Sequence, residues 1–107
     1  MEKLEPGNGG KSLPYKMEKF LERKLVRAVN RIEGLCVKFY CPTFTGLPDR
    51  LVLLPFGKIG FVEVKQEGEK PTPRQKYVHG ILQRLGFKVF VLDHEEQIPQ
   101  IIERIRQ

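Results

Sequence analysis

Two short apolar runs separated by a few loop residues constrain the fold of this chain more than any other feature. Asp49–Pro55 and Ile59–Lys65 are each of strand length, and a glycine lies in the three residues that separate them. Runs of this length and spacing predict a β-hairpin. Because side chains alternate along a strand, Glu63 and Lys65 share one face, while the valines beside Glu63 point to the other. The hairpin therefore has a charged face and an apolar face.

Apolar periodicity predicts helices on both sides of this hairpin. Met17, Leu21, Leu25 and further apolar residues share one side of a helix with basic residues opposite, and Gly34 is positioned to end it. The expected elements are a flexible arm over 1–15, a helix over 16–33, strands Leu35–Cys41, Asp49–Pro55, Ile59–Lys65 and Phe87–Leu92, a helix from Pro73 and a last helix near Pro99. We therefore expect one α/β domain over 16–107 behind the arm.

The second helix carries clear start and stop signals. Thr72 is a candidate N-cap with Pro73 in the first position, and Gly86 lies where a C′ glycine belongs. Its buried stripe is expected to comprise Tyr77, Val78, Ile81, Leu82 and Leu85, and that of the last helix Ile101, Ile102 and Ile105.

Composition excludes several classes of protein. Of 107 residues, 19 are Lys or Arg and 13 are Asp or Glu, which gives a net charge of +6, and 40% are hydrophobic. This is a globular balance, and the longest apolar run falls far short of the ~20 residues that cross a bilayer. Without a secretion signal we expect a cytoplasmic protein, in a bacterium or a phage-infected host. A positive charge of this size is compatible with binding to a polyanion such as nucleic acid, and equally with a basic surface that is simply solvated.

The charged face of the hairpin is the candidate site. A hairpin brings Asp49 beside Glu63, and two carboxylates that close repel each other unless a cation lies between them. Hard oxygen ligands favour Mg²⁺ or Mn²⁺. The first helix adds Glu22, on the shoulder of its apolar side, or Glu18 one turn earlier; of the two we favour Glu22. The alternative is that these glutamates pair with Lys or Arg.

The combination of motifs resembles the VRR-NUC (virus-type replication-repair nuclease) family of the PD-(D/E)xK nuclease superfamily. The resemblance rests on Gly46-Leu47-Pro48-Asp49-Arg50, on Glu63-Val64-Lys65, on the downstream Gln75 and on a Glu-bearing first helix. It covers about residues 16–95. It implies a restriction-endonuclease-like αβββαβ core, in which a central mixed sheet is flanked by helices.

The same resemblance implies metal-dependent hydrolysis of phosphodiester bonds. It assigns the metal to Asp49, Glu63, the Val64 carbonyl and, directly or through water, Glu22. Lys65 then orients or deprotonates the attacking water, and Gln75 positions substrate or water. Taken singly, Asp49 could only cap its turn, Glu63 and Lys65 could form a surface ion pair, and Gln75 could be solvated. The expected DNA-binding residues are Arg50, Arg74 and Lys38.

The expected substrate is DNA that is recognised by shape. The chain contains no helix rich in base-reading residues and has almost no room for a recognition domain, which argues against sequence-specific cutting. Stand-alone relatives imply a homodimer on branched DNA such as four-way (Holliday) junctions, with a role in DNA repair. A nuclease acting on flaps or forks, or a non-catalytic DNA-binding or assembly module, remains an alternative.

Two cysteines and two histidines lie outside these motifs. Cys36 and Cys41 are five residues apart, which places them on opposite faces of one strand, so we expect buried thiols and no zinc site. His79 and His94 have no partner histidine nearby in sequence, so we expect surface or packing roles.

Overall fold

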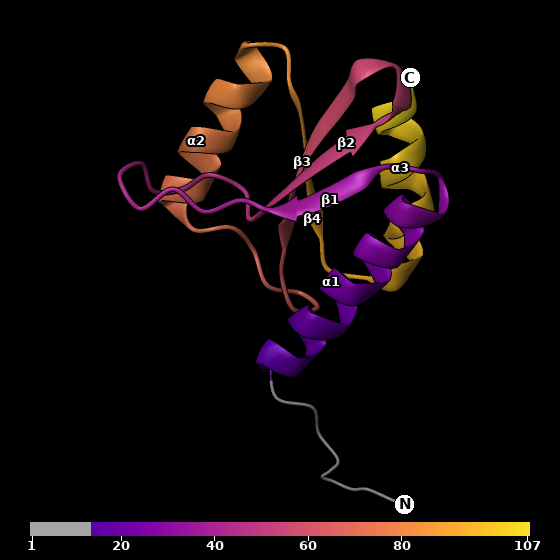
Figure 1. Cartoon of the computed structure of the whole chain (residues 1–107). Helices are drawn as coiled ribbons and strands as arrows, with labels where there is room; N and C mark the ends of the chain where they lie inside the picture. Colours follow the sequence, from indigo (N-terminus) through magenta and orange to yellow (C-terminus); the bar gives the residue numbers. More distant parts are fainter. Residues whose placement is uncertain (1–13) are drawn as a thin grey trace, which may run out of the picture.

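A computed structural model describes residues 14–107, with side chains from Met17 onward (Figure 1). The expected arm therefore lies outside the described residues except for its last two positions, which belong to the first helix. The elements are α1 (Pro14–Arg31), β1 (Leu35–Lys38), β2 (Arg50–Leu54), β3 (Lys58–Val64), α2 (Pro73–Arg84), β4 (Lys88–Leu92) and α3 (Ile98–Arg106), with short 3₁₀ turns at Pro55–Gly57 and Glu95–Gln97. This order confirms the predicted one.

The four strands form one mixed sheet in the order β1-β2-β3-β4. β1 and β2 pair antiparallel, as do β2 and β3, whereas β3 and β4 are parallel. In the predicted hairpin Arg50 lies opposite Val62, so the start of β2 and the end of β3 meet at one end of the sheet. The mixed sheet with flanking helices confirms the predicted fold class.

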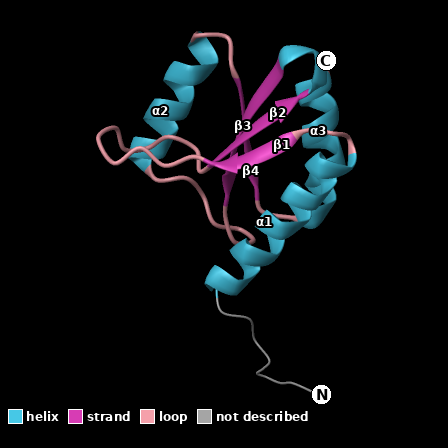
Figure 2. Ribbon diagram, in the orientation of Figure 1, coloured by secondary structure: helices cyan, strands magenta, loops and turns pink. Residues whose placement is uncertain are grey.

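Helices α1 and α3 cover one face of the sheet and α2 lies on the other (Figure 2). Leu25 and Val29 of α1, Val62 of β3 and Ile105 of α3 are almost completely buried in the core between them. Gly60 allows α3 to approach β3, because a Cβ atom there would overlap Ile105. The valines of β3 thus face this core, as predicted, and Glu63 and Lys65 face the side of α2.

Helix α2 begins and ends as predicted but buries fewer residues. Thr72 is its N-cap, and Gly86 has φ +98° beyond its C-terminus. Tyr77 and Leu85, expected in the buried stripe, are exposed; Val78 is buried, while Ile81 and Leu82 are half-buried. The prediction was wrong at the two exposed positions because α2 contacts the sheet mainly through β4, so only a narrow side of the helix is covered.

Two boundaries differ from the predicted ones for local reasons. β1 ends at Lys38, so Cys41 lies in the following loop and not on a strand face opposite Cys36. Helix α1 is followed by a left-handed residue at Glu33, with φ 66°, instead of at Gly34. Gly34 is needed for space, because a Cβ atom there would lie 2.7 Å from the Leu53 carbonyl oxygen. No helix among residues 14–107 is long and apolar enough to cross a membrane.

Candidate active site

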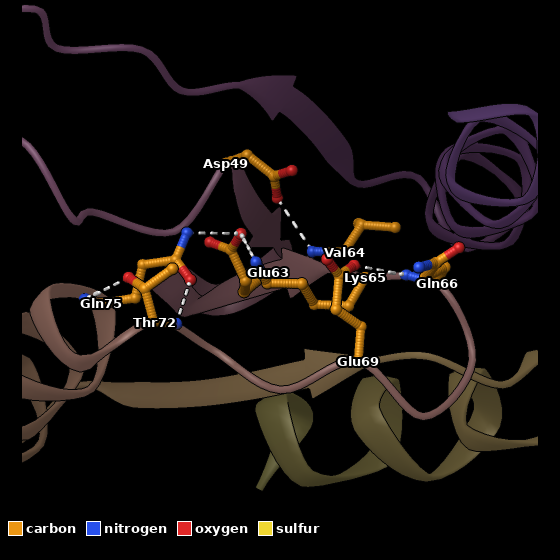
Figure 3. Close-up of polar contacts among 8 residues, drawn as sticks. All are labelled: Asp49, Glu63, Val64, Lys65, Gln66, Glu69, Thr72 and Gln75. Carbon is orange, nitrogen blue, oxygen red and sulfur yellow. Dashed lines mark hydrogen bonds and ion pairs between the residues drawn. The ribbon is translucent and has the colours of Figure 1, made fainter. Parts of the chain in front are cut away.

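The site lies where β2 begins and β3 ends. The hairpin register places Asp49, just before β2, beside the last residues of β3. The Val64 amide donates a hydrogen bond of 3.0 Å to Asp49 Oδ1, which fixes this carboxylate against the neighbouring strand (Figure 3). Burial raises the pKa of Asp49, with a further contribution from Glu22, although the Val64 hydrogen bond acts in the opposite direction.

Glu63 is the most perturbed carboxylate of the site. Only 5% of the residue is exposed. Its Oε2 lies 3.2 Å from the Gln75 Nε2 donor and 3.9 Å from Lys65 Nζ, while Oε1 is buried without a hydrogen-bond partner among the described residues. Burial, with Asp49 nearby, raises the pKa of Glu63 to about 7 even though Lys65 acts to lower it. A buried carboxylate oxygen without a donor is suited to a cation.

The cap of α2 orients Gln75. The Thr72 hydroxyl accepts from the Gln75 amide at 3.1 Å, and the Thr72 amide donates to Gln75 Oε1 at 2.9 Å, which completes a capping box. Because the side-chain oxygen is used in this way, the Nε2 group is left to donate to Glu63. The sequence Thr72-Pro73-Arg74-Gln75 therefore both starts a helix and aims an amide at the site.

Comparison with known proteins identifies the family to which this fold belongs. No model of a known protein family matches the sequence. A phage protein named "Putative nuclease p44", from Acyrthosiphon pisum secondary endosymbiont phage 1, is 51% identical over 79 residues, which are 74% of this chain and 85% of that protein. A solved structure titled "VRR_NUC domain" superposes with a TM-score of 0.76 at 35% identity, covering 81% of this chain and 95% of that one. The chain belongs to the VRR-NUC family. It is a nuclease domain.

The two glutamates on the first helix of this VRR-NUC domain occupy different electrostatic surroundings. Glu22 Oε2 lies 3.7 Å from Lys38 Nζ and 3.9 Å from Arg50 Nε, so Glu22 has the basic partners that were the alternative to a metal role. The pKa of Glu18 is raised by burial and by Glu69, and is also influenced by Lys65 and Asp49. Asp49 and Lys65 thus both influence the pKa of Glu18, whereas Glu22 is paired with Lys38 and Arg50 and contributes to the raised pKa of Asp49.

The three expected DNA-binding residues differ in how accessible they are. The Arg50 side chain is only 14% exposed, and its Nη1 donates to the Cys36 carbonyl at 3.2 Å. Lys38 and Arg74 are exposed. Arg50 also contributes to a groove beside α1, which is lined by Lys19, Glu22, Arg23, Val26, Arg27, Asn30 and Arg50. Four of these seven residues are basic, so the groove is suited to a phosphate backbone.

Sequence reasoning missed His79 as a neighbour of the site. It follows Gln75 by one helical turn and therefore shares its side of α2. The residue is 7% exposed, and its Nε2 is buried without a hydrogen-bond partner in the described part of the chain. Burial and the nearby Lys65 lower the pKa of His79. The spacing of four residues from Gln75 was the signal in the sequence.

The donor chemistry of the site fits Mg²⁺ or Mn²⁺. Asp49, Glu63 and the Val64 carbonyl supply only oxygen, which these ions prefer. The unpartnered Oε1 of Glu63 is the observation that supports the fit. Among residues 14–107 no three His, Cys, Asp or Glu side chains are close enough to form a preassembled metal centre, so two carboxylates and a carbonyl are the available set.

Proposed function

We propose that this VRR-NUC domain is a metal-dependent, structure-selective DNA endonuclease that cleaves branched DNA such as four-way junctions, and that it acts as a homodimer. The observation that carries the proposal is the meeting of Asp49, Glu63, Lys65 and Gln75 at one end of the sheet, with a buried Glu63 oxygen that has no donor. The family membership supports hydrolysis of nucleic acid.

Each side chain has a separate role in the proposed reaction. Asp49, Glu63 and the Val64 carbonyl would hold Mg²⁺ or Mn²⁺, and the ion would supply Lewis-acid chemistry at the scissile phosphate and at a bound water. Lys65, beside Glu63, orients the attacking water and offsets the negative charge that develops on the phosphate. Gln75 holds Glu63 in place and contacts substrate or water.

The basic groove along α1 and the exposed Lys38 support binding of the DNA backbone. Phosphate contacts position a duplex without reading its sequence, so the branch supplies the specificity. A dimer presents two sites for paired cuts on a symmetric junction. Of the two α1 glutamates, Glu18 is proposed to assist the metal through water in place of Glu22, because Glu22 is paired with Lys38 and Arg50 while Glu18 contributes to the raised pKa of Glu63.

A cleavage assay tests the proposal. Linear duplex, flap, fork, splayed-arm and four-way junction substrates are incubated with Mg²⁺, Mn²⁺ or EDTA. We expect cleavage of branched substrates in either metal, none in EDTA, and a loss of at least about 100-fold in Asp49→Ala and Lys65→Ala. Lys58→Ala, at the opposite end of β3, is the matched control and retains activity.

Other results would overturn all or part of the proposal. Binding of junctions in EDTA without cleavage in any divalent ion would identify a non-catalytic DNA-binding module. Full activity of Lys65→Ala would refute the proposed location of the active site. Faster cleavage of flaps or forks than of four-way junctions would show that flaps or forks are the preferred substrate. A monomeric mass by light scattering at assay concentrations would exclude the dimer.

A further inference from the structure

An exposed arginine lies between two exposed aromatic rings beside the active site. The Arg74 guanidinium carbon is 5.3 Å from the ring centroid of Phe44 and 5.7 Å from that of Tyr77. Arg74 Nε also donates to the Thr45 carbonyl at 3.2 Å. Phe44 is 45% exposed and Tyr77 is 60% exposed, so both rings present surface to solvent. We refer to Phe44, Arg74 and Tyr77 as the platform.

Close packing holds the two halves of the platform together. Phe44 lies in the loop between β1 and β2, and this loop runs beside the N-terminal end of α2, which carries the other two residues (Figure 1). Gly46, with φ +95°, allows the contact: a Cβ atom there would lie 2.8 Å from Val78 Cγ2 and 3.1 Å from Arg74 Cγ. Loop and helix therefore meet at a fixed distance, and the platform is formed before any ligand arrives.

Both segments that carry the platform also carry residues of the site. Arg74 directly precedes Gln75, whose amide donates to Glu63. The loop that bears Phe44 continues within five residues to Asp49, a span of at most about 18 Å even for an extended chain. A strand of DNA whose phosphate lies at Glu63 thus has the platform within reach of its neighbouring nucleotides.

We propose that the platform stacks an unpaired nucleobase of the DNA substrate next to the cleavage site. Aromatic faces with an interleaved arginine suit this ligand, since a base stacks on the rings while the cation attracts the adjacent phosphate. A paired base inside a duplex has both faces covered and cannot use the platform. The inference rests on the proposed nuclease function and refines its substrate to branched DNA with an unpaired nucleotide at the branch.

The test compares a fully paired four-way junction with a splayed-arm DNA that carries 2-aminopurine at the first unpaired position. We expect the double variant Phe44→Leu/Tyr77→Leu to bind and cleave the splayed arm about 5- to 100-fold less well, with a change below about twofold on the paired junction. Wild type should change the 2-aminopurine fluorescence and the Leu variant should not. Phe44→Tyr/Tyr77→Phe should restore both readouts.

Phe56→Leu is the matched control, because Phe56 is 96% exposed at the distant β2–β3 turn and is not part of the platform. Equal losses on both substrates, or the same loss in the control, would overturn the proposal. So would an unchanged fluorescence response in the folded Leu variant. If wild type cleaves no DNA with either metal, the proposed function itself fails; if it cleaves but the Leu variant keeps the wild-type preference, only the platform is refuted.

Discussion

Glu63→Gln should stabilise the metal-free protein, and should do so only at neutral and alkaline pH. The wild-type carboxylate is buried, and one of its oxygens has no donor among the described residues. Its pKa is raised from the usual 4.5 to about 7, so the folded protein prefers the neutral form. Glutamine resembles that neutral form in size and can still accept the Gln75 hydrogen bond through its carbonyl oxygen.

The size of the effect follows from the two pKa values. Below pH 4.5 Glu63 is protonated in both the folded and the unfolded state, so it contributes no difference. Between pH 4.5 and 7 the unfolded chain releases the proton that the folded chain retains, and stability falls as pH rises. Above pH 7 Glu63 is ionised in both states, and the full cost of burying its charge lowers the free energy of unfolding. At 1.36 kcal/mol per pKa unit, the rise from 4.5 to about 7 corresponds to about 3 kcal/mol. The free energy of unfolding of Glu63→Gln should therefore exceed that of wild type by about 3 kcal/mol at pH 8 and by less than about 1 kcal/mol at pH 5.

Urea unfolding in EDTA at pH 5 and pH 8 measures this difference directly. Groups that do not interact with Glu63 cancel when the variant is compared with wild type at each pH. Glu103→Gln, an exposed change on α3, controls for the loss of one negative charge. A Glu63→Gln stabilisation that is equal at both pH values would refute the argument that burial raises this pKa. In excess Mg²⁺ wild type should become more stable than Glu63→Gln, because the ion stabilises only the protein that binds it and the variant lacks one of the proposed ligands.

Further predictions concern the helix glutamates and two local structures. Glu18→Gln should reduce cleavage more than Glu22→Gln in the Mg²⁺ assay, while Glu22→Gln should mainly weaken binding to DNA or stability. Thr72→Ala should lower the free energy of unfolding by about 0.5–2 kcal/mol and reduce cleavage, with Thr72→Ser as the control that retains the cap. Gly34→Ala should lower the free energy of unfolding in urea by about 1–3 kcal/mol, because its Cβ atom would lie 2.7 Å from the Leu53 carbonyl oxygen in β2. Gly80→Ala in α2 is the control and should leave the free energy of unfolding unchanged or raise it.

Strand periodicity was sufficient to predict the part of the site that lies on the hairpin. Alternation along β3 put Glu63 and Lys65 on the face opposite the core, and their position there is confirmed. The turn between the two strands fixed the register, so Asp49 had to lie near the end of β3. Local capping chemistry likewise predicted Thr72 as the start of α2. These features depend on neighbours close in sequence, which is why a single sequence was enough.

Features that depend on how elements pack against each other were not predictable in the same way. The helical spacing of Tyr77 and Leu85 matches that of a buried stripe, but their burial depends on how much of α2 the sheet covers. Gly34 looks like a helix-ending glycine, yet its small size serves the contact with β2, and Glu33 adopts the left-handed conformation instead. His79 became a neighbour of Lys65 only when α2 was packed against the sheet.

The helix glutamates illustrate the limit most clearly, because Glu18 and Glu22 are one turn apart and lie on the same side of α1. Their choice of partner depends on where along its axis α1 crosses the sheet, and a helical wheel contains no axial coordinate. In the structure, the turn that carries Glu22 lies beside the Lys38 and Arg50 side chains, with which its carboxylate forms ion pairs of 3.7 Å and 3.9 Å. The preceding turn brings Glu18 within the influence of Lys65, Asp49 and Glu63. One turn of helix, about 5.4 Å, thus separates a glutamate that pairs with cations from one whose pKa is influenced by the residues of the site.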